Sequence, residues 1–275
     1  MTGRRSRYGV RLVLAALLAI VSIFPLLYML SLSFQPVGNI LSVPPVLVPT
    51  HPTVANYVQA WTENDFAGFF LNSTMVALGT VVGVLVLASL TAFGFSRFHF
   101  GGKEPLFYVM LASLAIPAVV LILPQYELMR TFGLINSRVG LTLLYISANL
   151  PFAIFLLRGF MEKIPFELED AMRVDGVSSL GILLRLILPL SRAALAAVAI
   201  FTFNGAWDEF VLALTMINTP SKRTVPIALA LFQQSHTTAW GTLFAASAIA
   251  TVPSIIIFVL AQRWFREGLS VGALR

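Results

Sequence analysis

Residues 165–189 read PFELEDAMRVDGVSSLGILLRLILP and form a polar island between two strongly apolar stretches of the chain. Proline is favoured in the first turn of a helix, so Pro165 predicts a helix start. Gly176 predicts the end of that helix, because glycine readily adopts the left-handed conformation found at helix ends. Ser178 or Ser179 can then cap a second helix. The segment therefore predicts two short helices separated by a break.

The two predicted helices carry both charged and apolar residues. Glu167, Glu169 and Asp170 lie in or near the first turn, where the helix dipole favours negative charge. The second helix has an apolar stripe with spacings of three and four residues, formed by Val177, Leu180 and Leu184. Such a stripe can pack against the protein's own helices or dock a partner, and the local pattern leaves both open.

The composition places this island in a membrane protein. Hydrophobic residues make up 58% of the 275 residues, charged residues make up 11%, and the mean hydropathy is +0.87, whereas soluble domains carry about 25% charged residues. Six apolar stretches are long enough to cross a hydrocarbon core of roughly 30 Å. They lie at about 9–32, 70–94, 106–124, 139–157, 193–217 and 241–261. We therefore expect an all-α membrane protein, one domain over residues 1–275, with a kink at Pro117 in the third stretch.

Lysine and arginine predict how the chain is oriented, because they concentrate in cytoplasmic segments. Most of the 18 lie in the N-terminal tail, the second–third connection, the fourth–fifth connection with its island, and the C-terminal tail. The opposite connections hold only Arg130, Arg138, Lys222 and Arg223. Both termini and the island are therefore expected in the cytoplasm. The net charge of +6 is explained by this bias and by anionic lipids, and it predicts no nucleic-acid partner.

The residue patterns that usually form catalytic, nucleotide-binding or metal sites are absent from the sequence. The chain has no cysteine and therefore no thiol chemistry. Residues 101–104 read GGKE, which lacks the first glycine and the hydroxyl residue of a nucleotide-binding loop. His51, His99 and His236 lack the spacing of metal ligands. We expect no catalytic, metal or cofactor site on this chain.

The island resembles the cytoplasmic EAA loop of ABC importer permeases. That pattern is Glu-Ala-Ala, three residues, Gly, nine residues, Ile, any residue and Leu-Pro. Here Asp170-Ala171-Met172 precedes Gly176 by the same three residues, and LILP follows nine residues after the glycine. Asp170, Met172 and Leu186 depart from this pattern, and Val177 replaces the small residue that is usual after the glycine.

The resemblance extends over nearly the whole chain. It includes Asn72-Ser73 at the start of the second stretch and Trp207-Asp208-Glu209-Phe210 in the fifth. Further segments similar to this family are FSRFHFGG at 95–102, PQY at 124–126, GLIN at 133–136, and the tail QRWF at 262–265 with Gly268-Leu269 and Gly272-Ala273. The tail resembles the maltose-type carbohydrate subgroup.

The resemblance implies a type I importer permease in the cytoplasmic membrane of a bacterium or archaeon, surrounded by lipid. It implies three kinds of protein partner: a second permease subunit, usually a different chain, a dimeric ATPase that holds ATP and Mg²⁺, and an external solute-binding protein. The EAA loop would insert into the ATPase as a coupling helix. The residues expected to carry this coupling are Glu167, Asp170, Ala171, Asp175, Gly176, Leu180 and Leu184.

The fifth apolar stretch holds two acidic residues well inside its predicted bounds, Asp208 and Glu209. Charges within a membrane span usually face protein or water. Asn204 lies one helical turn before Asp208, and Trp207 is adjacent. We therefore expect Asn204, Trp207 and Asp208 to face the translocation path of a sugar. In the alternative interpretation, the two acids pair with the partner permease or cap a broken helix.

Two other functions are alternatives to the importer. A stand-alone secondary carrier predicts internal repeats and broken-helix ion sites, and it leaves the polar island unexplained. A membrane-embedded enzyme needs a catalytic partner for Asp208 and Glu209, and the sequence shows none. The resemblance is compatible with disaccharides, oligosaccharides, amino sugars and glycerophosphate-type solutes.

Overall fold

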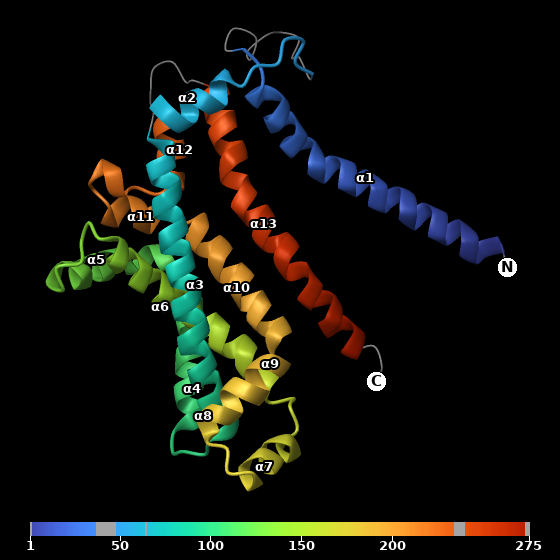
Figure 1. The fold of residues 1–275 in the computed structure, drawn as a ribbon, viewed down its shortest axis with the longest axis vertical. Helices are drawn as coiled ribbons and strands as arrows, with labels where there is room; N and C mark the ends of the chain where they lie inside the picture. The colour runs from blue at the N-terminus through green and yellow to red at the C-terminus, as the bar shows by residue number, and fades with distance from the viewer. Residues whose placement is uncertain (1, 37–47, 64, 234–239, 273–275) are drawn as a thin grey trace. The chain divides into compact units, whose positions relative to one another are not determined.

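A computed structural model describes residues 2–36, 48–63, 65–233 and 240–272 (Figure 1). The elements are α1 (Thr2–Ser33), α2 (Ala55–Glu63), α3 (Phe66–Arg97), α4 (Lys103–Ala112), η2 (Ser113–Ala115), η3 (Ala118–Leu121), α5 (Ile122–Thr131), α6 (Arg138–Met161), α7 (Phe166–Val174), α8 (Ser179–Ile182), η4 (Leu183–Ile187), α9 (Leu188–Leu190), α10 (Arg192–Trp207), α11 (Val211–Met216), η5 (Pro220–Lys222), α12 (Val225–Phe232) and α13 (Trp240–Gly272). No strand occurs in these ranges, which agrees with the all-α prediction.

Four single helices among the described residues are long and apolar enough to cross a membrane. They are Arg11–Ser33, Phe66–Arg97, Arg138–Met161 and Trp240–Gln262. These helices contain almost all of the first, second, fourth and sixth predicted stretches. Two further helix pairs pass the same test only as bent pairs, so the described residues hold four to six candidate spans.

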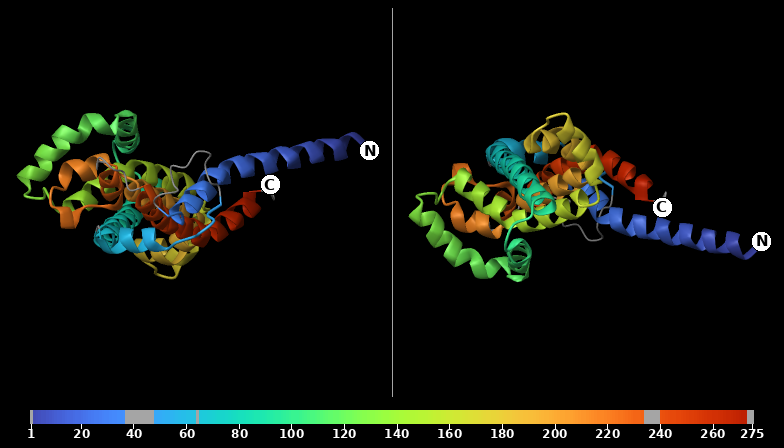
Figure 2. Two further views of the ribbon diagram at one scale, coloured as in Figure 1. Left: turned by 90° about the horizontal axis from the view of Figure 1, so that it is seen from above. Right: turned by 90° about the horizontal axis from the view of Figure 1, so that it is seen from below.

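The third predicted stretch, 106–124, is not a straight span. Lys103–Ala115 and Ala118–Thr131 meet at an angle of 99°, and Figure 2 shows this green segment turning sharply. The chain does bend at Pro117, as predicted, but the bend is a sharp turn between two helices and not a slight kink within one helix. Ile116 precedes the proline and is extended, with φ −82° and ψ 119°, because the proline ring disfavours helical conformation in the preceding residue.

The fifth predicted stretch, 193–217, is not one continuous helix either. Helix α10 ends at Trp207, and α11 begins again at Val211. At its other end α10 is bent by 81° from the Ser179–Leu190 segment. The break falls on the acidic residues, whose surroundings are described below.

The chain groups into two compact units, Met1–Ala67 with Ala228–Val252, and Gly68–Ile227 with Pro253–Arg275. The first unit is held partly by Asn56 of α2, whose Nδ2 donates to the carbonyl oxygens of Ser33 (2.9 Å) and Gln35 (2.8 Å). Thr242 of α13 donates to Gln59 of α2 at 2.9 Å. The prediction of a single domain over residues 1–275 stays a prediction.

The second unit contains the residues of the polar island and a well-packed core. Val84 of α3, Leu157 of α6, Ile187 of η4 and Val198 of α10 belong to one cluster and are fully buried. Because η4 lies inside the island, the second half of the island is anchored in this core by the burial of apolar side chains. Ala273, in the family-like tail, lies outside the described residues.

Candidate functional site

The polar island folds as two short helices with a break, as the sequence predicts. Pro165 immediately precedes α7, and Gly176 ends it with a φ of +77°. Gly176 N donates to Arg173 O (3.0 Å), and Val177 N donates to Met172 O (3.0 Å). This pair of bonds is a Schellman motif, in which the left-handed residue is usually glycine. Ser178, rather than Ser179, caps α8 by accepting a hydrogen bond from Gly181 N.

All seven residues expected to contact an ATPase are exposed. They are Glu167, Asp170, Ala171, Asp175, Gly176, Leu180 and Leu184. They lie in one continuous loop and the short helices that flank it. Their contact with an ATPase stays a prediction.

The apolar stripe on the second helix divides into two parts. Val177 packs against the buried core, whereas Leu180 and Leu184 are 56% and 55% exposed. The side chains that anchor this segment are instead Ile182 and Leu183, which are almost fully buried. Val177 therefore packs on the protein itself, whereas docking of a partner on Leu180 and Leu184 stays a prediction.

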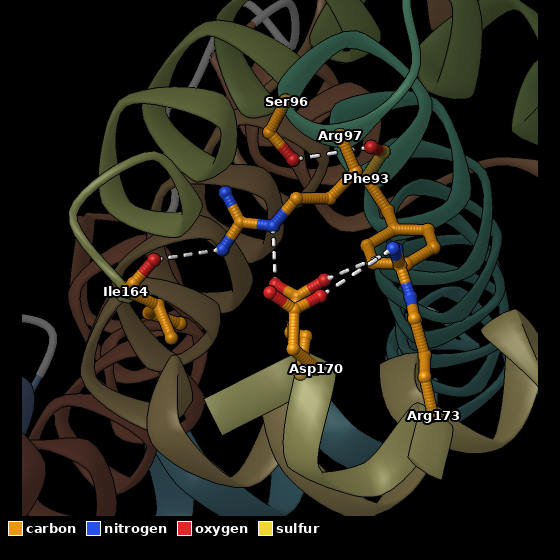
Figure 3. A network of polar contacts seen from close by, with 7 residues as sticks. Phe93, Ser96, Arg97, Ile164, Asp170 and Arg173 are labelled. Carbon is orange, nitrogen blue, oxygen red and sulfur yellow. Dashed lines mark hydrogen bonds and ion pairs between the residues drawn. The ribbon is translucent and has the colours of Figure 1, made fainter. Parts of the chain in front are cut away.

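Glu169 has a role that the sequence analysis missed. It is the only buried residue of α7, and its carboxylate accepts a hydrogen bond from Nε of Arg97, the last residue of α3. Nη2 of the same guanidinium donates to Ile164 O at 3.1 Å. Figure 3 shows Arg97 directed toward α7, with the ion pair of Asp170 and Arg173 beside it.

The helical spacing of α7 could have identified Glu169 as an inward-facing residue. It follows Phe166 by three residues and precedes Met172 by three, so it shares the inward side of the helix with Met172. The guanidinium carbon of Arg97 lies 4.6 Å from the centre of the Phe166 ring, within the range of a cation–π contact. The sequence alone indicates Glu169 only as a favourable charge near the helix start, and Arg97 only as a cytoplasmic charge within the family-like segment 95–102.

A second arginine joins the ends of α4 and α6. Arg158 donates to Glu104 at 2.8 Å and to Glu162 at 2.7 Å. Its guanidinium carbon lies 4.0 Å from the centre of the Phe107 ring. The two glutamates are about half exposed, so this contact is weaker than a buried pair. Together with Arg97 it ties the turn after α3 to the segment that leads into α7.

The acidic residues at the end of α10 have different surroundings. Glu209 accepts hydrogen bonds from Leu212 N (2.8 Å), Ala213 N (3.0 Å) and the Tyr145 hydroxyl (2.5 Å). It therefore caps α11, which is the broken-helix alternative raised by the sequence. Asp208 is exposed and ends α10.

Of the three residues expected to face a solute, Trp207 is 2% exposed. Its ring stacks on Phe203 and meets Phe70 edge-on, each with a centroid separation of 5.4 Å. Asn204 is half-buried, and its Oδ1 accepts no hydrogen bond from the described residues. Asp208 is thus the most accessible of the three, and the pathway role of all three stays a prediction.

Two asparagines fix the loop between α11 and α12. Asn72 Nδ2 donates to the carbonyl oxygens of Ser221 and Arg223, both at 2.9 Å. Asn136 Oδ1 accepts from Asn218 N (3.2 Å) and Thr219 N (3.0 Å). In the sequence both asparagines stand out only as points of resemblance, because local pattern does not show partners 80 or more residues away.

Comparison with known proteins identifies the family. Residues 85–271 match the family described as binding-protein-dependent transport system inner membrane component. The chain is 34% identical over 264 residues to the diacetylchitobiose uptake system permease protein NgcG of Streptomyces coelicolor, covering 95% of this chain and 87% of the relative. It is 33% identical to the galactooligosaccharides transport system permease protein GanQ of Bacillus subtilis, covering 95% and 93%.

A solved structure supports the fold. The bacterial ABC transporter involved in the import of the acidic polysaccharide alginate contains a chain that superposes with a TM-score of 0.85 at 21% identity, covering 96% of this chain and 98% of that one. The relatives are named as permease proteins, and the exposed loop, the buried anchor and the apolar helices fit that role. The chain therefore belongs to the binding-protein-dependent transport system inner membrane component family, as a permease subunit with the ABC importer fold.

Proposed function

We propose that this permease carries an oligosaccharide or a related sugar derivative into the cell, driven by ATP hydrolysis on a separate ATPase chain. The observation that carries the proposal is the loop at 165–189, whose buried face anchors it while its seven candidate coupling residues stay exposed. The sugar class is supported by relatives whose names specify diacetylchitobiose, galactooligosaccharides and sulfoquinovosyl glycerol. The last of these, SmoH of Agrobacterium fabrum, is 32% identical over 96% of this chain.

The proposed topology has six spans, with each bent pair counted as one. Both termini and the 165–189 loop face the cytoplasm of a bacterium or archaeon, since the positive charges gather there. The bends at Pro117 and at Ser191 do not exclude spanning, because non-helical backbone is tolerated at membrane depth where protein covers it.

The proposed complex contains a second permease subunit, an ATPase dimer that binds ATP and Mg²⁺, and a solute-binding protein outside the membrane. Support for the binding protein includes an alginate transporter structure with its oligosaccharide-bound periplasmic protein, which matches this chain with a TM-score of 0.71. A second permease different from this chain is proposed from the family resemblance. The loop would dock the ATPase through Leu180, Leu184 and the two exposed acidic residues of α7, Glu167 and Asp170.

Gly176→Pro is expected to remove the ATPase from the purified complex. Proline cannot adopt the φ of +77° and lacks the N–H that bonds Arg173 O. The loop would lose its sharp turn and hence the relative placement of α7 and α8. Affinity purification of the tagged permease from gently solubilised membranes, followed by mass spectrometry, measures this loss.

Gly133→Pro is the matched control, because Gly133 also has a positive φ (+67°), open space around it and an N–H that bonds a carbonyl three residues earlier, but lies in the turn after α5. We expect it to retain the ATPase. Recovery of the wild-type chain alone, with neither ATPase nor second permease, would contradict the importer and revive the stand-alone carrier.

Asp208→Asn is expected to leave assembly intact and to raise the KM for sugar uptake about tenfold, the size of one charge-assisted hydrogen bond. The carboxylate is exposed at the break between α10 and α11, where a solute hydroxyl could donate to it. Uptake of radiolabelled diacetylchitobiose and galactooligosaccharides by cells that express the complete importer provides the measurement. Glu127→Gln, which alters an exposed acid on α5, serves as the control. Identical kinetics for Asp208→Asn and wild type would contradict the pathway role.

A further inference from the structure

Helix α7 is attached to the rest of its unit by very few side chains. Glu169 is its only buried residue, and Met172 is half-buried against the core. The other seven of its nine residues are exposed. The two ends of α7 adjoin points where the backbone leaves helical conformation, at Pro165 and at Gly176. A displacement of α7 is therefore passed to the core mainly through Glu169.

Glu169 is held by a residue from a different part of the fold. The side chains of Arg97 and Glu169 are 1% and 0% exposed. The same guanidinium also binds Ile164 O, in the connection between α6 and α7, and lies over the Phe166 ring. Arg97 thus contacts α7 at its entry and at its middle (Figure 3).

This arrangement resists movement of α7 relative to α3. The guanidinium is planar and donates in fixed directions, so a shift or rotation of α7 breaks geometrically defined bonds. Separating the pair also takes from the buried Arg97 its carboxylate and leaves Glu169 with only the half-exposed Arg173, at 3.8 Å. The apolar contacts of Ile182 and Leu183 farther along the island lack such directionality.

We propose that Arg97 and Glu169 are positioning residues that make α3 and α7 move as one body, so that displacement of α7 by the ATPase is transmitted to α3. The inference rests on the proposed function, in which α7 docks an ATPase. It adds a specific route from the docking loop to a membrane-spanning helix. The pair itself is buried and is not part of the docking surface.

The absence of cysteine from the chain permits a direct test by spin labelling. Labels at His99→Cys, just after α3, and Val174→Cys, at the end of α7, occupy exposed positions. Double electron–electron resonance on the purified complete importer then gives the distance between them, without nucleotide and after trapping with ATP and orthovanadate. We expect the same narrow distance distribution in both states.

In the Glu169→Gln variant the charge is lost while the shape is kept. We expect the ATPase to remain bound, because the exposed docking residues are unchanged. The label distance should broaden, or shift on trapping by about 2 Å or more, the size of helix movements in switching proteins. Glu162→Gln is the matched control, since it makes the same chemical change in the exposed pair with Arg158. It should behave as wild type.

The outcomes separate this inference from the proposed function. An ATPase missing from the wild-type complex overturns both. If the ATPase is present but the Glu169→Gln distances equal those of wild type, only the inference is overturned. A label distance that shifts on trapping in the wild-type complex also overturns only the inference. Loss of the ATPase from Glu169→Gln without a change in the distance would make the pair a structural support, and would also overturn the inference.

Discussion

Arg97→Met is expected to lower the free energy of unfolding of the permease by about 3–5 kcal/mol, the cost of leaving one partner of a buried ion pair without the other. Glu169 is fully buried and would keep its place in α7 with only the half-exposed Arg173 as a counter-charge. Arg173 cannot replace Arg97, because it is about half exposed and lies 3.8 Å from Glu169 Oε2. Denaturant unfolding of the purified permease in mixed micelles, followed by tryptophan fluorescence, gives the change.

The double variant Arg97→Met with Glu169→Leu is expected to recover most of this loss. Two apolar side chains can replace a buried ion pair with little change in stability, because neither charge then has to be desolvated. The double variant should nevertheless lack the directional bonds between α3 and α7. It therefore separates the stability of the fold from the transmission proposed for the pair.

Arg130→Met is the control for the first prediction. Arg130 pairs with Glu127 at 3.6 Å, and the two side chains are 69% and 53% exposed. Removal of such a surface pair changes stability by less than about 1 kcal/mol. An Arg97→Met variant that unfolds at the same denaturant concentration as Arg130→Met would show that the buried pair contributes no more than a surface pair.

Glu209→Ala is expected to destabilise the permease by roughly 3 kcal/mol, about 1 kcal/mol for each of three donors that lose their acceptor. Two of the donors are backbone N–H groups at the start of α11, and the third is the hydroxyl of Tyr145 on α6. Loss of the cap should loosen α11 and the loop that follows it. The same unfolding experiment measures the effect.

Asp208→Asn provides the neighbouring control for stability. Asp208 adjoins Glu209 in sequence but is exposed, and no hydrogen bond of its carboxylate occurs within the described residues. Its substitution should change the free energy of unfolding by less than about 0.5 kcal/mol. If Glu209→Ala were as mild as Asp208→Asn, Glu209 would not be the cap that holds the break.

The sequence by itself determined the features that depend on neighbouring residues. Long apolar runs require helices, since only a helix satisfies its backbone within a single segment in lipid. The end of α7 at Gly176 and the cap at Ser178 were also predictable, because each depends on residues within one turn. The two short helices of the loop at 165–189 were predictable for the same reason, and its role in coupling stays a prediction from the family pattern.

The tertiary structure alone decided the features that join distant segments. Arg97 and Glu169 are 72 residues apart, and Tyr145 and Glu209 are 64 apart. Residue type and local spacing do not show which buried charge meets which partner. The pattern at 193–217 was apolar enough to predict a continuous helix, but the contacts of Glu209 with α6 and α11 stabilise a break. A buried polar group needs a partner, and only the packed fold supplies one.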